Sequence, residues 1–517
     1  MPIPACDVRE HRGVTRIHLA LAGLCAGLAG LAVSHAVTML LTIRATPLVA
    51  VAEAVIQLTP GALAETLIQL VGTYDKPLLI LGTTLGLLAL SAVAGVLTRR
   101  SQVFGILVFV AMGVVAFIAV WTRPGASVYD VLPVVVGTIT WISLLSFLAD
   151  YLRSRGAPEH HELSPESRRG FLIRAGIVAG AAVAIGVGGQ FIGRARRGVE
   201  ASRQLLKLPV SRGVVPAGAD LGVTGIEPWR SGNSGFYRID TALVVPTVDP
   251  NEWTLRIHGM VDQEIELSYR DLLERQMTET WMTICCVSNE VGGDLIGNAW
   301  WSGVRIADLL EEAGVSPDAD AVLQTSEDGW NCGTPLAALT DDRNSMLALA
   351  MNGQPLPVEH GFPVRMIVPG LYGYVSATKW LVDIEVSRFD RFTAYWTERG
   401  WSAEGPVRTQ SRIDTPRDGQ NVIAGERKIG GSAWAQQTGI EKVEYRLDGS
   451  DWQEATLGRV PGLDTWVQWT ATVDLSRGDH ELAVRATDSS GYTQTSVRRD
   501  VVPDGATGWH SVAFQAD

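Results

Sequence analysis

The sequence has few cysteines and few charged residues, and its balance of charge is not basic. Its 517 residues include 5 cysteines, an odd number that contains the adjacent pair Cys285 and Cys286, so a framework of disulfides is excluded. The formal net charge is −12, and no basic cluster lies outside the flanks of the apolar segments. Nucleic acid is therefore excluded as a partner, because it is bound by cationic side chains that displace its counterions.

Long apolar runs are abundant before residue 195 and absent after it. A helix needs about 20 apolar residues to cross a bilayer. Five predicted spans cover residues 17–43, 77–97, 103–121, 131–148 and 171–192. The sequence thus predicts an α-helical transmembrane bundle over residues 1–197, which anchors the chain in a membrane.

The arginines beside these spans predict their orientation. Three sets fall on one side of the membrane, and they are Arg9, Arg12 and Arg16, then Arg99 and Arg100, then Arg153, Arg155, Arg168 and Arg169. The N-terminus is thus predicted inside a bacterial cell and the second half of the chain on the outer or periplasmic side. Arginines 194, 196 and 197 run against this rule. Residues 46–71, with polar residues at helical spacing, are predicted as a helical hairpin on the outer face.

The segment 167–172, Ser-Arg-Arg-Gly-Phe-Leu, precedes the apolar stretch from Ile177 to Ile192. Twin arginines before such a stretch are typical of the signal that exports folded, cofactor-bearing proteins. Its position in mid-chain favours a retained anchor. The alternative is a membrane flank with two ordinary cytoplasmic arginines.

No haem is expected in the spans. They contain two histidines, His18 and His35, which lie 17 positions apart on one predicted helix. At about 1.5 Å of rise per residue they are separated by roughly 25 Å, so one haem cannot use both as ligands.

After a linker at 198–224, short β-rich runs alternate with helical patterns, which predicts a mixed α+β domain over 225–403. Predicted strands include residues 243–245 and 253–259, and predicted helices lie near 269–275 and 305–312. Cys286 follows an apolar strand and opens a polar loop, a position that favours a metal-ligating thiolate. A disulfide with Cys285 or a core thiol is the alternative.

Residues 404–517 carry short alternating strands near 422–425, 440–447, 466–471 and 480–486, with turns at Asp448-Gly449 and Ser490-Gly491. Regular strands with inward Val, Leu and Trp predict an all-β sandwich of immunoglobulin-like type.

Several motifs in order resemble the sulfite oxidase family of molybdopterin-dependent oxidoreductases. They are residues 253–259, the Cys-x-x-Asn of 286–289, 292–297, 301–305 and the block from His-Gly-Phe-Pro-Val-Arg at 360–365 to Lys379-Trp380. The resemblance implies a molybdenum-molybdopterin cofactor, with Cys286 as the one protein thiolate on the metal. It also implies a C-terminal domain of the dimerisation type and therefore a homodimer, although a passive spacer is the alternative.

The resemblance implies further site residues. Cofactor contacts are expected from Tyr237, Asp240 and Thr241 in an upstream loop, from Ser326, and from His360, Arg365, Ala377, Thr378 and Lys379. Tyr372, Glu290 and Trp300 are expected beside the reacting centre. Sulfite-oxidising members place arginines at the positions of Glu290 and Trp300, so a neutral or larger substrate, such as a sulfoxide or N-oxide, is favoured here.

The favoured function is therefore oxygen-atom transfer by a membrane-anchored molybdenum enzyme that exchanges electrons with a quinone or a cytochrome. A sulfite or sulfur-oxyanion dehydrogenase is the alternative among enzymes. A catalytically silent surface receptor or scaffold with the same fold is the alternative of another class.

Overall fold

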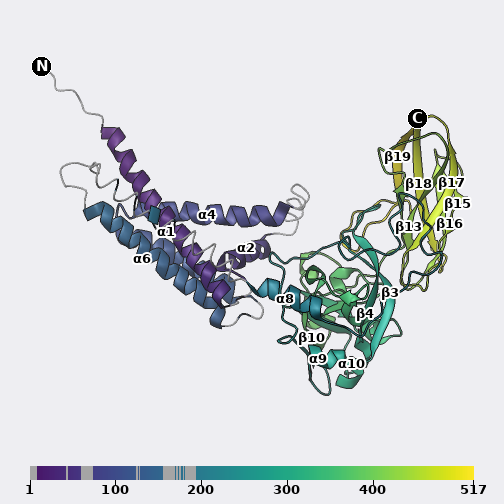
Figure 1. Cartoon of the computed structure of the whole chain (residues 1–517), viewed down its shortest axis with the longest axis horizontal. Helices are drawn as coiled ribbons and strands as arrows, with labels where there is room; N and C mark the ends of the chain where they lie inside the picture. The colour runs from purple at the N-terminus through teal and green to yellow at the C-terminus, as the bar shows by residue number, and fades with distance from the viewer. Residues whose placement is uncertain are drawn as a thin grey trace. The chain divides into compact units, whose positions relative to one another are not determined.

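The computed structural model describes residues 8–41, 43, 45–59, 74–123, 126, 128–154 and 194–517, together with residues 169, 173, 176, 177 and 180. Contacts divide the chain into two compact units, residues 1–199 with 242–244 and residues 200–241 with 245–517 (Figure 1). Most of the predicted fifth span, nearly all of the twin-arginine motif and the second half of the predicted hairpin lie outside the described residues.

The first unit is helical. Four of its helical segments are long and apolar enough to cross a membrane, at Arg16–Leu40, Asp75–Leu97, Gln102–Trp121 and Val128–Asp150. They coincide with the first four predicted spans. The elements themselves are α1 (Val8–Leu40), α2 (Pro47–Leu58), α4 (Asp75–Leu97), α5 (Gln102–Trp121), η2 (Val128–Val131) and α6 (Leu132–Ser154).

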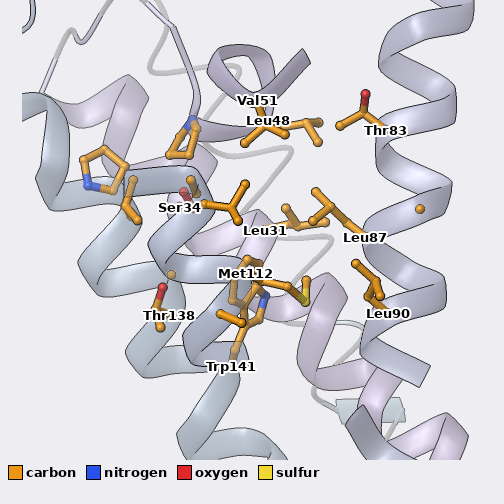
Figure 2. A pocket seen from close by; sticks show the side chains of 18 of the residues that line it. Leu31, Ser34, Leu48, Val51, Thr83, Leu87, Leu90, Met112, Thr138 and Trp141 are labelled. Atoms are coloured by element: carbon orange, nitrogen blue, oxygen red, sulfur yellow. The ribbon is translucent and has the colours of Figure 1, made fainter. Parts of the chain in front are cut away.

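Small residues allow the long helices to pack closely. A Cβ on Gly23 of α1 would collide with the backbone oxygen of Ser91 in α4, and one on Gly95 of α4 would collide with the backbone of Leu19. Close backbone approach at glycine is a common way for membrane helices to associate. Trp141 of α6, which lines the apolar groove shown in Figure 2, donates from Nε1 to the Gly27 carbonyl oxygen at 3.0 Å. Large apolar side chains such as Leu81, which is exposed, remain on the outside of the helices.

The boundary between the two units falls within α8 (Arg194–Leu205), and the chain continues after this helix as an irregular segment to residue 253. The prediction of a strand at residues 243–245 is therefore wrong. Pro246 follows this run directly and Pro250 comes four residues later, and since a proline cannot donate a ladder hydrogen bond, the run cannot extend into a longer strand.

One mixed sheet and one antiparallel sheet form the α+β region. The first has the order β2 (Ile265–Ser268), β1 (Thr254–Gly259), β10 (Leu381–Ser387), β5 (Ala321–Ser326), β6 (Asn331–Pro335). The second has the order β3 (Met277–Cys285), β4 (Ile296–Arg305), β7 (Met346–Met351), β8 (Gln354–Pro355), and β9 (Arg365–Ile367) also pairs with β7. The helical elements are α9 (Tyr269–Leu273), α10 (Ile306–Ala313), α11 (Ala337–Thr340), η3 (Val358–His360), η4 (Gly373–Val375), η5 (Phe389–Arg391) and η6 (Thr397–Arg399).

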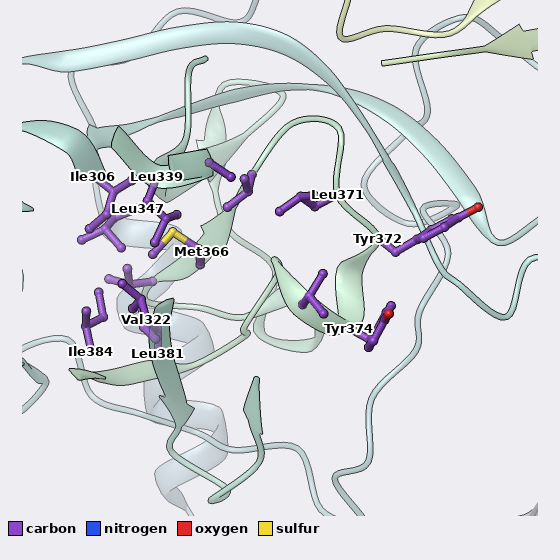
Figure 3. Packing of buried hydrophobic residues seen from close by; sticks show 14 of the residues in the cluster. Ile306, Val322, Leu339, Leu347, Met366, Leu371, Tyr372, Tyr374, Leu381 and Ile384 are labelled. Atoms are coloured by element: carbon purple, nitrogen blue, oxygen red, sulfur yellow. The ribbon is translucent and has the colours of Figure 1, made fainter. Parts of the chain in front are cut away.

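Aliphatic side chains from both sheets and from the helices form the core of this region (Figure 3). Leu347 of β7, Val322 of β5 and Ile306 of α10 are all fully buried. In Figure 3, Tyr372 and Tyr374 lie apart from this aliphatic group. The sheets are thereby fixed to one another, and the loops at their ends have a rigid base.

The C-terminal region is built from two further sheets. One has the order β11 (Gln410–Thr415), β13 (Gly425–Trp434), β17 (Val467–Leu475), β16 (Thr456–Leu457), and the other β12 (Asn421–Val422), β19 (His510–Ala516), β18 (Gly478–Asp488), β14 (Ile440–Leu447), β15 (Gln453–Glu454). Buried residues of both sheets, among them Trp469 and Val484, form a single core. The predicted turn is present, with positive φ at Asp448 and Gly449.

Candidate active site

The hairpin of β3 and β4 presents two different faces. The register pairs Trp281 with Trp300 and Cys285 with Ile296, so these side chains share one face. Residues 282, 284, 297, 299 and 301 share the other face. Trp301, on this second face, packs against Phe236 at 5.7 Å between ring centroids. Two adjacent tryptophans of one strand therefore point in opposite directions.

Cys286 follows β3 and starts the loop that leads to β4. Its N–H donates to the Leu295 carbonyl oxygen at 2.9 Å, and its own carbonyl accepts from the Asn289 N–H at 3.0 Å. The buried Asn289 closes the loop, because its Oδ1 accepts from the Leu295 N–H at 2.9 Å. The Cys-x-x-Asn spacing thus builds a fixed turn that holds the Cys286 thiol.

The two adjacent cysteines have different surroundings. Cys285 is buried, and its thiol donates to the Cys286 carbonyl oxygen at 3.4 Å. Cys286 is half-buried and interacts electrostatically with Tyr237 and Lys379. Burial raises the pKa of both thiols, although hydrogen bonds from Ser288 oppose the rise at Cys286. A free thiolate is disfavoured at Cys286, so a bound cation or metal is needed to stabilise it.

Aromatic side chains line the face that carries Trp301. Phe236 stacks on Tyr237 at 5.3 Å and meets the His360 ring edge-on at 5.7 Å. Gly297 of β4 is needed for this contact, because a Cβ there would lie 2.7 Å from the Phe236 ring. The Tyr237 side chain lies within electrostatic range of Cys286 and Arg365. The upstream loop, distant in sequence, therefore reaches Cys286.

Arg365 lies buried behind this aromatic wall. Its guanidinium group donates to the carbonyl oxygens of His360 at 3.1 Å and Ala377 at 3.5 Å, and it lies 5.4 Å from the Trp301 ring centroid. Among the described residues no carboxylate pairs with it, and its Nε has no hydrogen-bond partner. Burial lowers the pKa of Arg365 to about 10, so it remains a cation at neutral pH. An unpaired buried guanidinium group is costly unless an anion joins it.

His360 and Lys379 complete this group. Burial, with Arg365 and Lys379 adding to the effect, lowers the pKa of His360 to about 3, so its imidazole is neutral. Its Nε2 lies 3.2 Å from the Asn233 carbonyl oxygen, and its Nδ1 has no partner in the described part of the chain. Burial lowers the pKa of Lys379 to about 8, while the Asp240 carboxylate, 3.1 Å from Nζ, opposes that change. Asp240 also pairs with Arg238 at 2.8 Å.

Two contacts hold the turn that precedes Lys379. Thr378 Oγ1 lies 3.2 Å from the buried Cys332 thiol, and the Ala377 N–H donates to the Gly373 carbonyl oxygen at 3.0 Å. Ser326, at the end of β5, pairs in register with Leu381, and its Oγ accepts from the Asp328 N–H at 3.5 Å. Ser326 is thus placed at the strand end beside this turn.

Two residues of the C-terminal region hold the loop after Cys286. Arg412 of β11 donates from Nη1 to the Gly293 carbonyl oxygen at 2.9 Å and forms a buried ion pair with Asp414 at 2.6 Å. The His510 ring of β19 packs against Gly292, whose φ is +83°, so that a Cβ there would collide with the imidazole. The loop that bears Cys286 is therefore supported by the C-terminal sheets as well as by β3 and β4.

Some predicted site residues lie elsewhere. Trp300 packs on Trp281 at 5.3 Å between ring centroids, on the face of the hairpin opposite Trp301, so the structure does not bring it together with Phe236 and Arg365. Glu290 belongs to the Cys286 loop, and its side chain is exposed. Tyr372 is buried, and its hydroxyl oxygen accepts from the Arg408 N–H at 3.3 Å, although Cys285 and Cys286 both contribute to the strong rise of its pKa. Thr241 is half-buried at the end of the upstream loop.

The sequence also left useful residues unassigned. Asn233 binds His360 through its carbonyl oxygen and receives a hydrogen bond from Asn352 at 2.7 Å. Trp301 stacks on Arg365. Because side chains alternate along a strand, the sequence already indicated that Trp300 and Trp301 lie on opposite faces. Arg412 and His510 come from a distant region, and no local pattern marks them.

These residues fit an anionic, metal-bearing cofactor. Over the described ranges no group of three or more His, Cys, Asp or Glu side chains could hold a metal ion, so a metal here would need further ligands from a cofactor. Of the three cysteines in this region, Cys285 and Cys332 are buried and Cys286 is half-buried. The buried Arg365 without a carboxylate and the uncommitted Nδ1 of His360 are suited to phosphate oxygens and polar ring atoms. The site is therefore of the class in which a cofactor brings further ligands to a single cysteine.

Comparisons with known proteins agree with this class. Residues 242–396 match the family described as the oxidoreductase molybdopterin binding domain. Mitochondrial sulfite oxidase of Homo sapiens is 30% identical over 289 residues, which cover 47% of this chain and 53% of the human protein. The uncharacterized oxidoreductase YuiH of Bacillus subtilis is 34% identical over 180 residues, covering 35% of this chain and 87% of YuiH.

Among solved structures, the sulfane dehydrogenase SoxCD from Paracoccus pantotrophus is similar, with a TM-score of 0.48, 21% identity, and coverage of 62% of this chain and 92% of that one. The chain spans about half the length of the mitochondrial sulfite oxidases that it matches. It belongs to the sulfite oxidase family of molybdopterin-dependent oxidoreductases, and its cofactor is molybdenum-molybdopterin.

Proposed function

We propose that this chain is a membrane-anchored molybdenum enzyme that transfers an oxygen atom between a small substrate and a metal held by Cys286. One observation carries the proposal. The half-buried Cys286 thiol lies in a fixed turn on the side of Tyr237 and Lys379, whereas Cys285 is buried. When bound, the cofactor supplies the two-electron redox change and the oxygen-atom transfer.

Each neighbouring residue has a proposed role. Arg365 and Lys379 neutralise the anionic part of the cofactor, with His360, Ala377, Thr378 and Ser326 as further polar contacts. Asp240 orients Lys379 through the 3.1 Å contact, and Thr241 closes the same loop. Tyr237 lies between Cys286 and Arg365 and would shield the thiolate from water. Arrangement by buried, fixed groups is effective because they need no reorganisation during the reaction.

We propose a neutral or larger substrate, such as a sulfoxide or N-oxide. Support comes from Glu290, an exposed carboxylate in the Cys286 loop, which would repel a dianion. Trp300 no longer supports this choice, since it packs on the opposite face of the hairpin. Oxidation of sulfite or another sulfur oxyanion is the second candidate, favoured by the 30% identity to human sulfite oxidase.

The anchor and the C-terminal region complete the proposal. Four helices suited to crossing a membrane, with a predicted fifth, would hold the chain in a bacterial cell membrane with the catalytic unit on the outer or periplasmic side. The two C-terminal sheets and their common core support an immunoglobulin-like sandwich. A homodimer formed through this sandwich is proposed from the family resemblance alone. A quinone or a cytochrome is the proposed electron partner.

The test is a substrate screen on the full-length, molybdenum-loaded protein with artificial electron donors and acceptors. Reduction of sulfoxides or N-oxides, without oxidation of sulfite, supports the favoured substrate class, and the reverse pattern supports the second candidate. Protein that folds with no molybdenum when produced with ample molybdate would overturn the enzyme and favour a silent receptor or scaffold.

A further inference from the structure

The turn between β7 and β8 consists of Asn352 and Gly353, because Met351 pairs with Gln354. Both turn residues have positive φ, +53° at Asn352 and +72° at Gly353. Two such residues in a two-residue hairpin form the type I′ turn, which asparagine followed by glycine favours. Turn geometry accounts for the backbone of Asn352, but it does not account for the three hydrogen bonds that its side chain makes.

The Asn352 side chain fastens the loop that leads to the proposed cofactor contacts. Its Nδ2 donates to the Ser231 carbonyl oxygen at 3.0 Å and to Asn233 Oδ1 at 2.7 Å. Its Oδ1 accepts from the Trp300 N–H at 3.1 Å, so the same amide is held by β4. The Asn233 side chain donates in turn to the Met351 carbonyl oxygen at 3.2 Å. The position of the Asn233 backbone therefore depends on the turn at Asn352.

The Asn233 backbone determines which nitrogen of His360 carries the hydrogen. His360 Nε2 lies 3.2 Å from the Asn233 carbonyl oxygen, and since a carbonyl can only accept, the hydrogen is on Nε2. Burial and the nearby cations Arg365 and Lys379 lower the pKa of His360 to about 3, so the ring is neutral. A neutral imidazole has one N–H, and Nδ1 is therefore an acceptor. This buried atom has no hydrogen-bond partner in the part of the chain that the structure describes.

We propose that Asn352 is a positioning residue of the cofactor site, and that through Asn233 it fixes His360 as a hydrogen-bond acceptor. A buried acceptor without a partner costs free energy, so Nδ1 requires a donor. His360 thus meets an N–H or O–H group of the cofactor, whereas Arg365 and Lys379 take its anionic oxygens. The proposal rests on the proposed function, because it needs the cofactor beside His360.

Two substitutions at Asn352 separate the side chain from the turn. Asn352→Gly keeps the positive φ without steric cost and removes all three hydrogen bonds of the side chain. Asn352→Asp tolerates the same backbone and keeps an oxygen for the Trp300 N–H, but it replaces the donor to Ser231 and Asn233 with a second acceptor. Both variants should therefore release Asn233 while the turn is retained.

A second pair of turn residues supplies the matched control. Asp448 and Gly449, in the C-terminal region, also have positive φ, +51° and +71°. Asp448 contacts a histidine as well, since its Oδ2 lies 2.7 Å from His480 Nδ1. Asp448→Gly thus removes a side chain from similar backbone geometry and releases a histidine that is outside the cofactor site.

The experiment is nitrogen NMR of the full-length protein with isotopically labelled histidine, prepared both without molybdenum and with the cofactor bound. The His360 signals are those missing from His360→Gln. Without molybdenum and at neutral pH, we expect the hydrogen on Nε2 and none on Nδ1. Asn352→Gly and Asn352→Asp should give a mixture of the two neutral forms, whereas Asp448→Gly should keep the natural His360 signals.

Release of the cofactor on heating is the second measurement. We expect release to be about tenfold faster in both Asn352 variants, as is typical when a residue that orients a contacting group is lost. Asp448→Gly should release the cofactor at the natural rate. Equally fast release from Asp448→Gly would overturn the positioning role of Asn352.

A hydrogen on Nδ1 in the natural protein, or an unchanged His360 signal in Asn352→Asp, would also overturn this role. A doubly protonated His360 in the loaded protein would overturn its role as an acceptor. Protein that takes up no molybdenum would refute the proposed function, and the nitrogen signals of that protein would still support or overturn the effect of Asn352 on His360.

Discussion

The two faces of the β3–β4 hairpin perform different tasks although their residues alternate along the same strands. One face carries Trp281, Thr283 and Cys285 toward the C-terminal region, where the Trp466 N–H donates to Thr283 Oγ1 at 2.8 Å. The other face carries Trp301 toward Phe236 and Arg365. Packing and the proposed cofactor binding are thus separated by a single residue step, and paired substitutions can test that separation.

The largest expected effect separates the two cysteines. Cys286→Ala should reduce turnover more than about 100-fold and lower the molybdenum content, because it removes the proposed metal ligand. Cys285→Ala should retain at least partial activity, since that thiol is buried in the hydrophobic core. Both variants are compared by metal analysis and by turnover with artificial donors. Equal loss of molybdenum and turnover in the two variants would contradict the assignment of different roles to Cys285 and Cys286.

The next effect concerns the buried cation. Arg365→Met should reduce cofactor retention by about tenfold or more, because the proposed anion loses its buried partner. Arg305→Met is the control, since Arg305 also donates to a backbone carbonyl, that of Asp341, at 2.9 Å, but lies at the far end of β4. Cofactor released by heat is measured in both proteins. An equally large loss of cofactor from Arg305→Met would show that the effect is not specific to Arg365.

A smaller effect is the pH dependence of stability that arises from His510, which packs against the loop after Cys286. Burial, with Arg412 adding to it and Asp414 opposing it, lowers the pKa of His510 to about 4 from its ordinary 6.5. The unfolded chain therefore binds a proton more readily between these values, and the stability of the folded unit is full above pH 6.5 and falls as pH decreases toward 4. The upper limit of the loss is about 3.5 kcal/mol, since the difference between 6.5 and about 4 is about 2.5 pKa units and one unit corresponds to about 1.4 kcal/mol.

His510→Asn tests this origin. The asparagine amide does not titrate in this range, and it keeps an acceptor for the Ile413 N–H, which donates to His510 Nδ1 at 2.9 Å in the natural protein. Thermal unfolding is followed from pH 7.5 to 4.5. The variant should show the shallower decline, and parallel curves for the two proteins would contradict the assignment.

The smallest effect separates the two tryptophans. Trp301→Phe should weaken cofactor retention, because the Phe236 contact and the Arg365 stacking are both altered, whereas Trp300→Phe should cost about 1 kcal/mol of stability and leave the relative rates with different substrates unchanged. Rates with sulfoxide, N-oxide and sulfite are compared for each protein. A changed substrate preference in Trp300→Phe would show that Trp300 does lie beside the substrate.

Sequence patterns predicted much of the architecture because they have strong local causes. The first four spans follow from apolar length alone, and the strand at residues 440–447 follows from alternation between turns. The prediction at 243–245 failed because this short apolar run is followed at once by Pro246, which cannot donate a ladder hydrogen bond and so prevents a longer strand. Apolar composition alone therefore predicted a strand where the chain is irregular.

The site was predicted less evenly, for a physical reason. Motif order brought Cys286, His360, Arg365 and Lys379 to attention, and the structure places these residues within one group. Strand alternation predicts that Trp300 and Trp301 lie on opposite faces, but the sequence does not say which of the two faces meets Phe236 and Arg365. Arg412 and His510 reach the Cys286 loop from strands more than one hundred residues away, and such contacts depend on tertiary packing that no local pattern encodes.

X-ray absorption at the molybdenum edge tests the central claim most directly, because it counts the sulfur atoms bound to the metal. The family resemblance gives two sulfurs from the cofactor, so we expect a third from Cys286 in the natural protein and in Cys285→Ala. Cys286→Ala should show one sulfur fewer. An unchanged sulfur count in Cys286→Ala, or the loss of a sulfur in Cys285→Ala instead, would contradict the account.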